Sequence, residues 1–204
     1  MMKKIIVLLL GIITAGCYAE AEVYADNIKA EIRLLNIHVG KSNMSDLALA
    51  YGVIPKMYTH MDISNKKFKL KQACIEEEKK GGSPIYIVFS SNWGNDYIEI
   101  AQVDVSKVKP SGQECIKTPI ELTSYLGVGK NRIIQKFGKP IENSYISEKY
   151  NSNKYLSFEV LEYSHVKANG SNRKLETLYA ITFELDKNEI VKSYTINSDD
   201  EYVD

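Results

Sequence analysis

The chain has 204 residues, of which 44% are hydrophobic, 10% aromatic and 25% charged, a composition that excludes a disordered, collagen-like or coiled-coil protein. Its 26 Lys and Arg residues balance its 26 Asp and Glu residues, so the net charge is zero. The chain therefore lacks the net positive charge that drives non-specific binding to nucleic acids, and we expect no nucleic-acid partner.

The beginning of the chain has the features of a signal peptide. Lys3 and Lys4 form a basic start, and an apolar run extends from Ile5 to Ile13. This run is too short to cross a membrane, which takes about 20 apolar residues. We expect residues 1–21 to contain the export signal and its cleavage site. Loss of Lys3 and Lys4 would leave the mature protein mildly acidic.

Two cleavage sites are possible, and they predict different anchors. Thr14-Ala15-Gly16-Cys17 resembles a bacterial lipobox, in which the Cys becomes lipidated and forms the new N-terminus. The usual inner-membrane retention signal of lipoproteins is an Asp after that Cys, whereas this chain has Tyr18, so the resemblance implies the outer membrane. The alternative is an ordinary signal peptidase that cuts after Ala21, at the small-x-small site formed with Ala19. We favour lipidation of Cys17.

The two remaining cysteines predict a disulfide. Either cleavage removes Cys17 from the thiol count, so Cys74 and Cys115 are left as a pair in an oxidising compartment. A bond between them would stabilise the fold by about 4 kcal/mol in the chain-entropy model. The alternative, two buried free thiols, applies if the protein is not exported.

A repeat organises the mature chain. Gly52 and Gly138 are 86 positions apart, and each ends a short segment with helical periodicity. The first segment runs from Met44 to Tyr51, with Ser42 expected as its N-cap. The second contains apolar residues at positions 133, 134 and 137. We expect both glycines to occupy helix C′ positions with positive φ.

Three segments with strand character follow each helix. They cover residues 68–76, 85–90 and 98–105 in the first copy, and 155–163, 175–185 and 189–197 in the second, where residues 186–188 form a turn. The sequence therefore predicts an α+β fold of two tandem αβββ repeats, each a short helix packed on one face of an antiparallel sheet. The repeats would span 32–106 and 116–200, joined by a linker at 107–115.

One helix can cover only one face of its sheet, so the other face is left to solvent or to a partner. Alternation assigns the following residues to the helix-covered core: Tyr179, Ile181, Phe183, Leu185, Ile190, Tyr194 and Ile196. Tyr86, Tyr155 and Tyr163 fall on the opposite face, where their rings would be available to a partner. Trp93, in a polar loop between strands, is expected to contribute most to binding.

A family resemblance agrees with this organisation. The segment from Gly127 to Pro140 resembles the signature of the SmpA/OmlA-like outer-membrane-assembly lipoproteins, Gly-x-Thr followed by a short helix and Gly-x-Pro, with Gly129 in place of the usual Thr or Ser. A tandem pair of such units is similar to the β-lactamase-inhibitor-protein family. The resemblance implies a fold and an envelope location more than an activity.

The sequence contains no catalytic motif that we can identify. His38, His60 and His165 are isolated and lack the spacing of metal ligands. Gly40-Lys41-Ser42 ends like a phosphate-binding loop, but Leu35 stands where the first glycine is required. We therefore predict no enzyme activity, no metal and no cofactor.

These observations lead to a functional hypothesis. We expect an exported, non-enzymatic protein–protein interaction protein of the bacterial envelope, located in the periplasm and anchored to the outer membrane through Cys17. Its partner would be an envelope or secreted protein, and its role that of an assembly scaffold lipoprotein or of an enzyme inhibitor or immunity protein. The alternative is a periplasmic protein that binds a small molecule or lipid in an apolar groove between the sheets.

Overall fold

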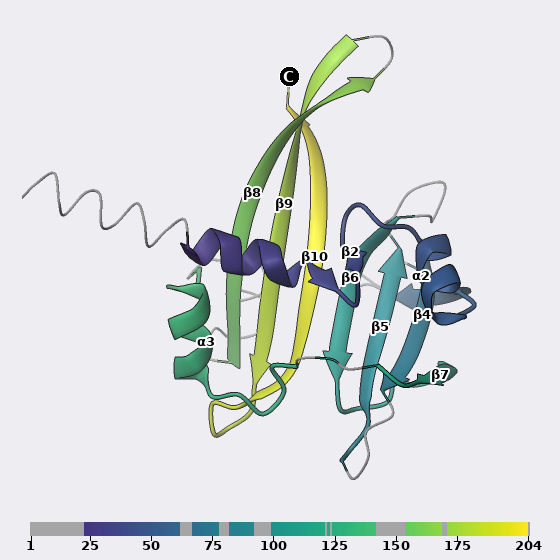
Figure 1. Ribbon diagram of the computed structural model, residues 1–204, viewed down its shortest axis with the longest axis vertical. Coiled ribbons are helices and arrows are strands. Elements are labelled where there is room, and N and C mark those ends of the chain that lie inside the picture. Colours follow the sequence, from purple (N-terminus) through teal and green to yellow (C-terminus); the bar gives the residue numbers. More distant parts are fainter. Residues whose placement is uncertain are drawn as a thin grey trace, which may run out of the picture.

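The computed structural model of the protein describes residues 23–61, 67–77, 82–91, 99–120, 122, 124–141, 154–168 and 171–203. It confirms the α+β class, with short helices on one side of a large, mostly antiparallel sheet (Figure 1). Seven strands of this sheet follow one another in the order β3-β4-β5-β6-β10-β9-β8, and β7 pairs in parallel with β4 as the eighth. A separate two-stranded sheet contains β1 and β2.

The first half of the chain begins with a helix over residues 23–31. Its other elements are β1 (Arg33–Leu34), β2 (Ile37–His38), α2 (Met44–Tyr51), β3 (Lys56–Met61), β4 (Lys67–Glu77), β5 (Ile85–Ser91) and β6 (Ile100–Ser106). The second half contains β7 (Cys115–Thr118), α3 (Lys130–Phe137), β8 (Tyr155–Ala168), β9 (Ser171–Leu185) and β10 (Val191–Val203). The predicted helices and long strands are all present, whereas helix 23–31, β1, β2, β3 and β7 are additions to the prediction. None of the described helices is long and apolar enough to cross a membrane.

The start of α2 differs from the prediction by one residue. Asn43, not Ser42, is the N-cap, because its side chain accepts hydrogen bonds from the backbone N–H groups of Ser45 and Asp46. Asp46 in turn accepts from the backbone N–H of Asn43 at 2.8 Å, which completes a capping box. Ser42 instead accepts a hydrogen bond from the backbone N–H of His38.

Both predicted glycine terminators are confirmed. Gly52 follows α2 with φ 67° and ψ 16°, the left-handed conformation of a helix C-cap. Gly138 follows α3 with φ 83° and ψ −155°. Residues that have a Cβ atom rarely adopt this second backbone conformation. The way in which α3 ends at Gly138 is therefore almost restricted to glycine.

The strands of the two halves form one continuous sheet. β6 and β10 pair antiparallel, with Ser106 opposite Ser193 and Gln102 opposite Asn197. This pairing uses backbone groups that would otherwise lie at two exposed edges.

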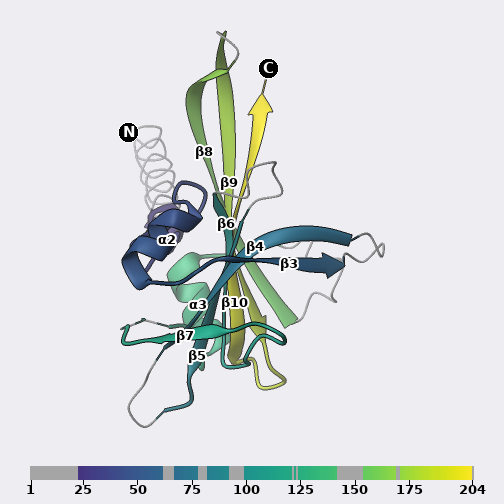
Figure 2. The same cartoon turned by 90° about the vertical axis from the view of Figure 1, so that its right-hand side faces the viewer.

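The helices cover one face of this sheet, and the core lies beneath them (Figure 2). The alternation predicted for β9 and the middle of β10 is confirmed, since Tyr179, Phe183 and Tyr194 are all buried. The prediction for Ile190 was wrong, because Val191 is the buried residue, with 2% of its surface exposed. A register shift between Val191 and Ser193 explains the difference, since a bulge changes which residues face the core.

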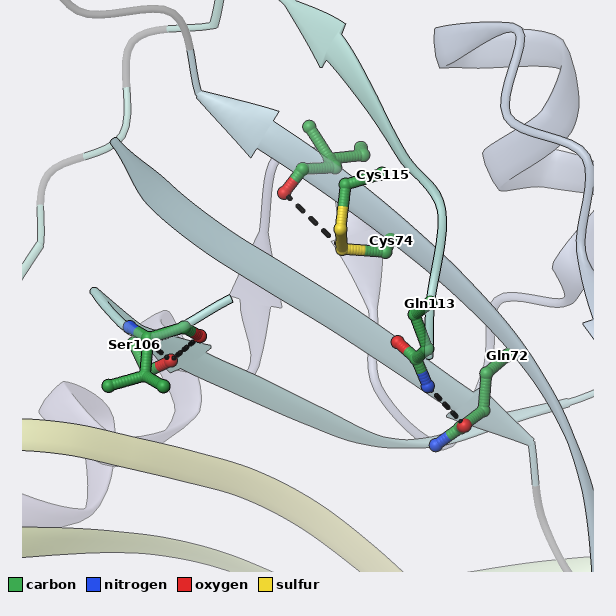
Figure 3. The surroundings of a disulfide bond; sticks show 7 residues. Gln72, Cys74, Ser106, Gln113 and Cys115 are labelled. Carbon is green, nitrogen blue, oxygen red and sulfur yellow. Dashed lines mark hydrogen bonds between the residues drawn. A yellow bond between two sulfur atoms is a disulfide. The ribbon is translucent and has the colours of Figure 1, made fainter. Parts of the chain in front are cut away.

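The disulfide between Cys74 and Cys115 is confirmed (Figure 3). The two residues are direct partners across the parallel pair β4 and β7, with Cα atoms 4.5 Å apart. The bond therefore holds the end of the predicted linker against the sheet.

Candidate functional site

The candidate site is the sheet face opposite the helices. We call it the open face and define it by Cys74, Val88, Asp104, Thr195 and Ser157, which lie on five different strands in one transverse row. None of the described helices lies on it, and β3 and the adjoining end of β4 project from the sheet on this side (Figure 2). The sequence predicted such a face from strand alternation.

A neighbouring row brings two of the predicted binding residues together. Pairing between adjacent strands places Tyr86, Ser106, Ser193, Glu184 and Tyr155 in line across β5, β6, β10, β9 and β8. Tyr86 and Tyr155 therefore stand on the same face, as the alternation predicted, and strand pairing also places them in the same row.

Tyr86 is less accessible than expected. Only 9% of its surface is exposed, and it packs in a cluster with Cys74, Val88 and Cys115. The expectation of an exposed ring fails at this position because β7 and the disulfide add apolar surface beside it. Its role in binding stays a prediction.

Tyr155 is half-buried and belongs to a polar cluster around Glu184. Its hydroxyl donates to Glu184 Oε1 at 3.2 Å, and Ser193 donates to Glu184 Oε2 at 2.8 Å. Lys192 forms an ion pair of 2.6 Å with the same carboxylate. Although desolvation opposes the effect, these contacts hold the pKa of Glu184 below its usual range, so it is a carboxylate at neutral pH.

Tyr163 lies far from these two residues. It follows Tyr155 by eight positions on β8, about 27 Å along the strand. Its ring is 56% exposed, and the Lys174 ammonium lies 3.9 Å from the ring centroid. Trp93 and Cys17 lie outside the described residues, so their roles stay predictions.

The centre of the open face holds a carboxyl group that the sequence analysis missed. Asp104, on the middle strand β6, accepts hydrogen bonds from Thr195 Oγ1 at 2.7 Å and from Gln102 Nε2 at 2.8 Å. Burial raises the pKa of Asp104, while the two hydrogen bonds oppose the rise. Within the described part of the chain no Lys, Arg or His forms an ion pair with it.

Other amide and hydroxyl groups lie on the same face, on both halves of the sheet. Gln72 Nε2 donates to Ser90 Oγ at 2.8 Å, and Gln113 Nε2 donates to Gln72 Oε1 at 2.5 Å (Figure 3). Ser157 and Thr182 share a hydrogen bond of 2.9 Å on the other half of the sheet. The open face is thus internally hydrogen-bonded, but Gln72, Ser90, Ser157 and Thr182 are only 2–6% exposed. The part of the face that is accessible lies around Gln102, Asp104 and Thr195.

A pocket of about 370 Å³ lies at one end of the open face, where β4, β5, β6 and β10 meet. It is lined by Leu70, Ser91, Ala101, Gln102, Asn197, Ser198 and Asp199. The side-chain oxygen of Asn197 is buried and has no hydrogen-bond partner among the described residues. A second cavity, of about 430 Å³, lies beside the β1–β2 turn and is lined in part by Glu31, Leu35 and Tyr51.

No group of three or more His, Cys, Asp or Glu residues that could hold a metal ion occurs among the residues that the structure describes. Comparison of the chain with protein-family models, with curated proteins and with solved structures gave no match.

Proposed function

We propose that the protein is an exported, non-enzymatic protein–protein interaction protein of the bacterial envelope and that it binds its partner through the open face. One observation carries the proposal: the described helices all pack on one side of a continuous sheet, while strand pairing lines up polar residues on the other side, where Gln102 is exposed and Asp104 and Thr195 are half-buried. A rigid sheet with positioned hydrogen-bonding groups binds a partner with little loss of conformational entropy.

We also propose that the chain consists of two tandem αβββ units. Each half contains a helix followed by three long antiparallel strands, α2 with β4, β5 and β6, and α3 with β8, β9 and β10. The last strands of the two halves meet at the centre of the sheet, in the order β4-β5-β6-β10-β9-β8. Two copies of one unit that pair edge to edge about a twofold axis would give this order.

The envelope location is supported by the disulfide, because such bonds persist in oxidising compartments. It agrees with the signal peptide and with lipidation at Cys17, both of which we propose from the sequence. A scaffold lipoprotein and an enzyme inhibitor or immunity protein would both use the open face in this way.

Site-specific photocrosslinking in intact cells tests the proposal. A photoreactive residue at Gln102, which is exposed on the open face next to Asp104, should give a discrete crosslinked partner. The matched control is Leu49, which is 87% exposed on the helix α2 and so lies on the opposite side. A partner that crosslinks equally from both positions, or from neither, would refute binding through the open face.

A further inference from the structure

We infer that the pocket of about 370 Å³ at the end of the open face receives one basic side chain, an arginine or lysine, of the bound partner protein. This inference rests on the proposed function and adds the chemistry of the contact.

The shape of the pocket suits a long side chain. Leu70 and Ala101 supply apolar surface for methylene groups, while Gln102, Asn197 and Asp199 supply polar groups. A water molecule takes up about 30 Å³, so the volume corresponds to about twelve waters and is ample for one such side chain. Arginine and lysine combine an apolar stem with a charged end in this way.

The pocket contains oxygen acceptors that no described residue uses. Asn197 Oδ1 is buried without a partner among the described residues, which is unfavourable until a donor arrives. One of the two N–H groups of the Gln102 amide donates to Asp104, and its carbonyl oxygen has no hydrogen-bond partner among the described residues. Asp199 adds an exposed carboxylate at the pocket. A donor-rich group is therefore the complementary occupant.

Charge selects a cation over a neutral donor. Asp199 lines the pocket, and Asp104 accepts a hydrogen bond from Gln102, another lining residue. Neither carboxylate forms an ion pair with any described residue. An arginine or lysine would neutralise this negative charge, whereas an anionic group would be repelled.

The test uses two peptides that differ only in charge. Acetylated, amidated Ala-Ala-Arg-Ala-Ala is titrated into the purified full chain, and the side-chain amide signals of Asn197 are followed by NMR. The control peptide carries citrulline, the neutral analogue of arginine. The arginine peptide should shift these signals saturably at millimolar concentration, and the citrulline peptide should bind at least about tenfold more weakly.

A pair of variants locates the charge. Asp199→Asn should reduce the affinity for the arginine peptide about tenfold, to the level of the citrulline peptide. Asp200→Asn makes the same change at the next residue, on the other face of the strand, and should leave the affinity unchanged. Both positions are exposed, so both variants should fold.

Three results would overturn the inference: no saturable shift, equal binding of the two peptides, or equal effects of the two variants. If photocrosslinking at Gln102 nevertheless captures a partner, the proposed function stands and only the basic contact is wrong. If the peptides behave as expected but Gln102 captures no partner, the pocket is a cation site and binding of a protein through the open face fails.

Discussion

Gly138 lies directly against the ring of Tyr24, so that a Cβ atom at Gly138 would be 2.8 Å from Tyr24 Cδ2. The end of α3 thereby contacts the helix over residues 23–31, which crosses the sheet beside it (Figure 1). Gly138 is required here for two independent reasons, its backbone conformation and the absence of space for a side chain.

Gly138→Ala should lower the free energy of unfolding by about 3 kcal/mol, because strain from the backbone adds to overpacking against Tyr24. Gly52→Ala is the matched control, since Gly52 also has positive φ but a Cβ atom there would have no neighbour within 4 Å among the described residues. It should lower the same free energy by about 1 kcal/mol. Urea denaturation of both variants measures the difference, and equal losses would show that contact with Tyr24 has no effect.

Removal of the disulfide should destabilise the protein by about 4 kcal/mol, because the bond closes a loop with a sequence separation of 41 residues. A Cys74→Ala, Cys115→Ala double variant and the reduced protein should unfold at a similarly lowered urea concentration. Addition of reductant should not change the double variant. A double variant as stable as the oxidised protein would contradict this expectation.

Local signals account for the parts of the fold that the sequence predicted. Met44–Tyr51 and Lys130–Phe137 carry their apolar spacing and their terminating glycines within a few residues, so each helix can be recognised alone. β7 has only four residues and pairs in parallel with β4, a partner far away in the chain. A strand this short shows too few alternating residues for the sequence to predict it. Helix 23–31 could have been found from Ile28 and Ile32, which are four residues apart and both buried.

The part of the candidate site that the sequence predicted also depends on local patterns. Alternation gave the correct face for Tyr86 and Tyr155, because side chains on a strand point to alternate sides. It could not show that β7 and its disulfide bury Tyr86. Asp104 was missed because a charged residue between Val103 and Val105 has the pattern of an ordinary solvated position.

A charged cluster joins the helix over residues 23–31 to α3. Lys136 Nζ lies 2.7 Å from Glu31 Oε1 and contacts the Tyr125 hydroxyl, which donates to Glu31 at 2.5 Å. Asn27 Nδ2 adds a hydrogen bond of 2.7 Å to the backbone carbonyl of Lys136. Lys136→Met should therefore lower the free energy of unfolding by about 1 kcal/mol and speed amide hydrogen exchange in residues 23–31.

Lys130→Met provides the control for this cluster. Lys130 lies on the same helix and forms an ion pair of the same length, 2.7 Å, but its partner Glu189 has a 60% exposed side chain. Exposed ion pairs contribute little, so this variant should change the free energy of unfolding by less than about 0.5 kcal/mol. Exchange in residues 23–31 should stay as in the unmodified protein. Equal effects of the two variants would show that the cluster does not hold the helix.

Asp104→Asn should stabilise the protein at neutral pH by about 1 kcal/mol, the size of one hydrogen-bond change. Burial raises the pKa of Asp104 in the folded state above its ordinary value of about 3.9, so folding favours the protonated carboxyl. Its contribution to stability is complete below that ordinary value and is lost as the pH rises through the raised pKa. Asparagine stays neutral and can still accept the hydrogen bond from Thr195. Its NH2 group cannot accept the bond from Gln102 Nε2, so the prediction requires that the relief from desolvation exceeds this loss.

The advantage of Asp104→Asn should therefore be present at pH 7 and absent at pH 3, where the carboxyl is protonated in both the folded and the unfolded chain. Urea denaturation at the two pH values measures it. Asp199→Asn removes the same charge at an exposed position of β10 and should change stability by less than about 0.5 kcal/mol at either pH. If Asp104→Asn destabilises the protein at pH 7, the hydrogen bonds from Thr195 and Gln102 outweigh desolvation, and the carboxylate is the stable form on the open face.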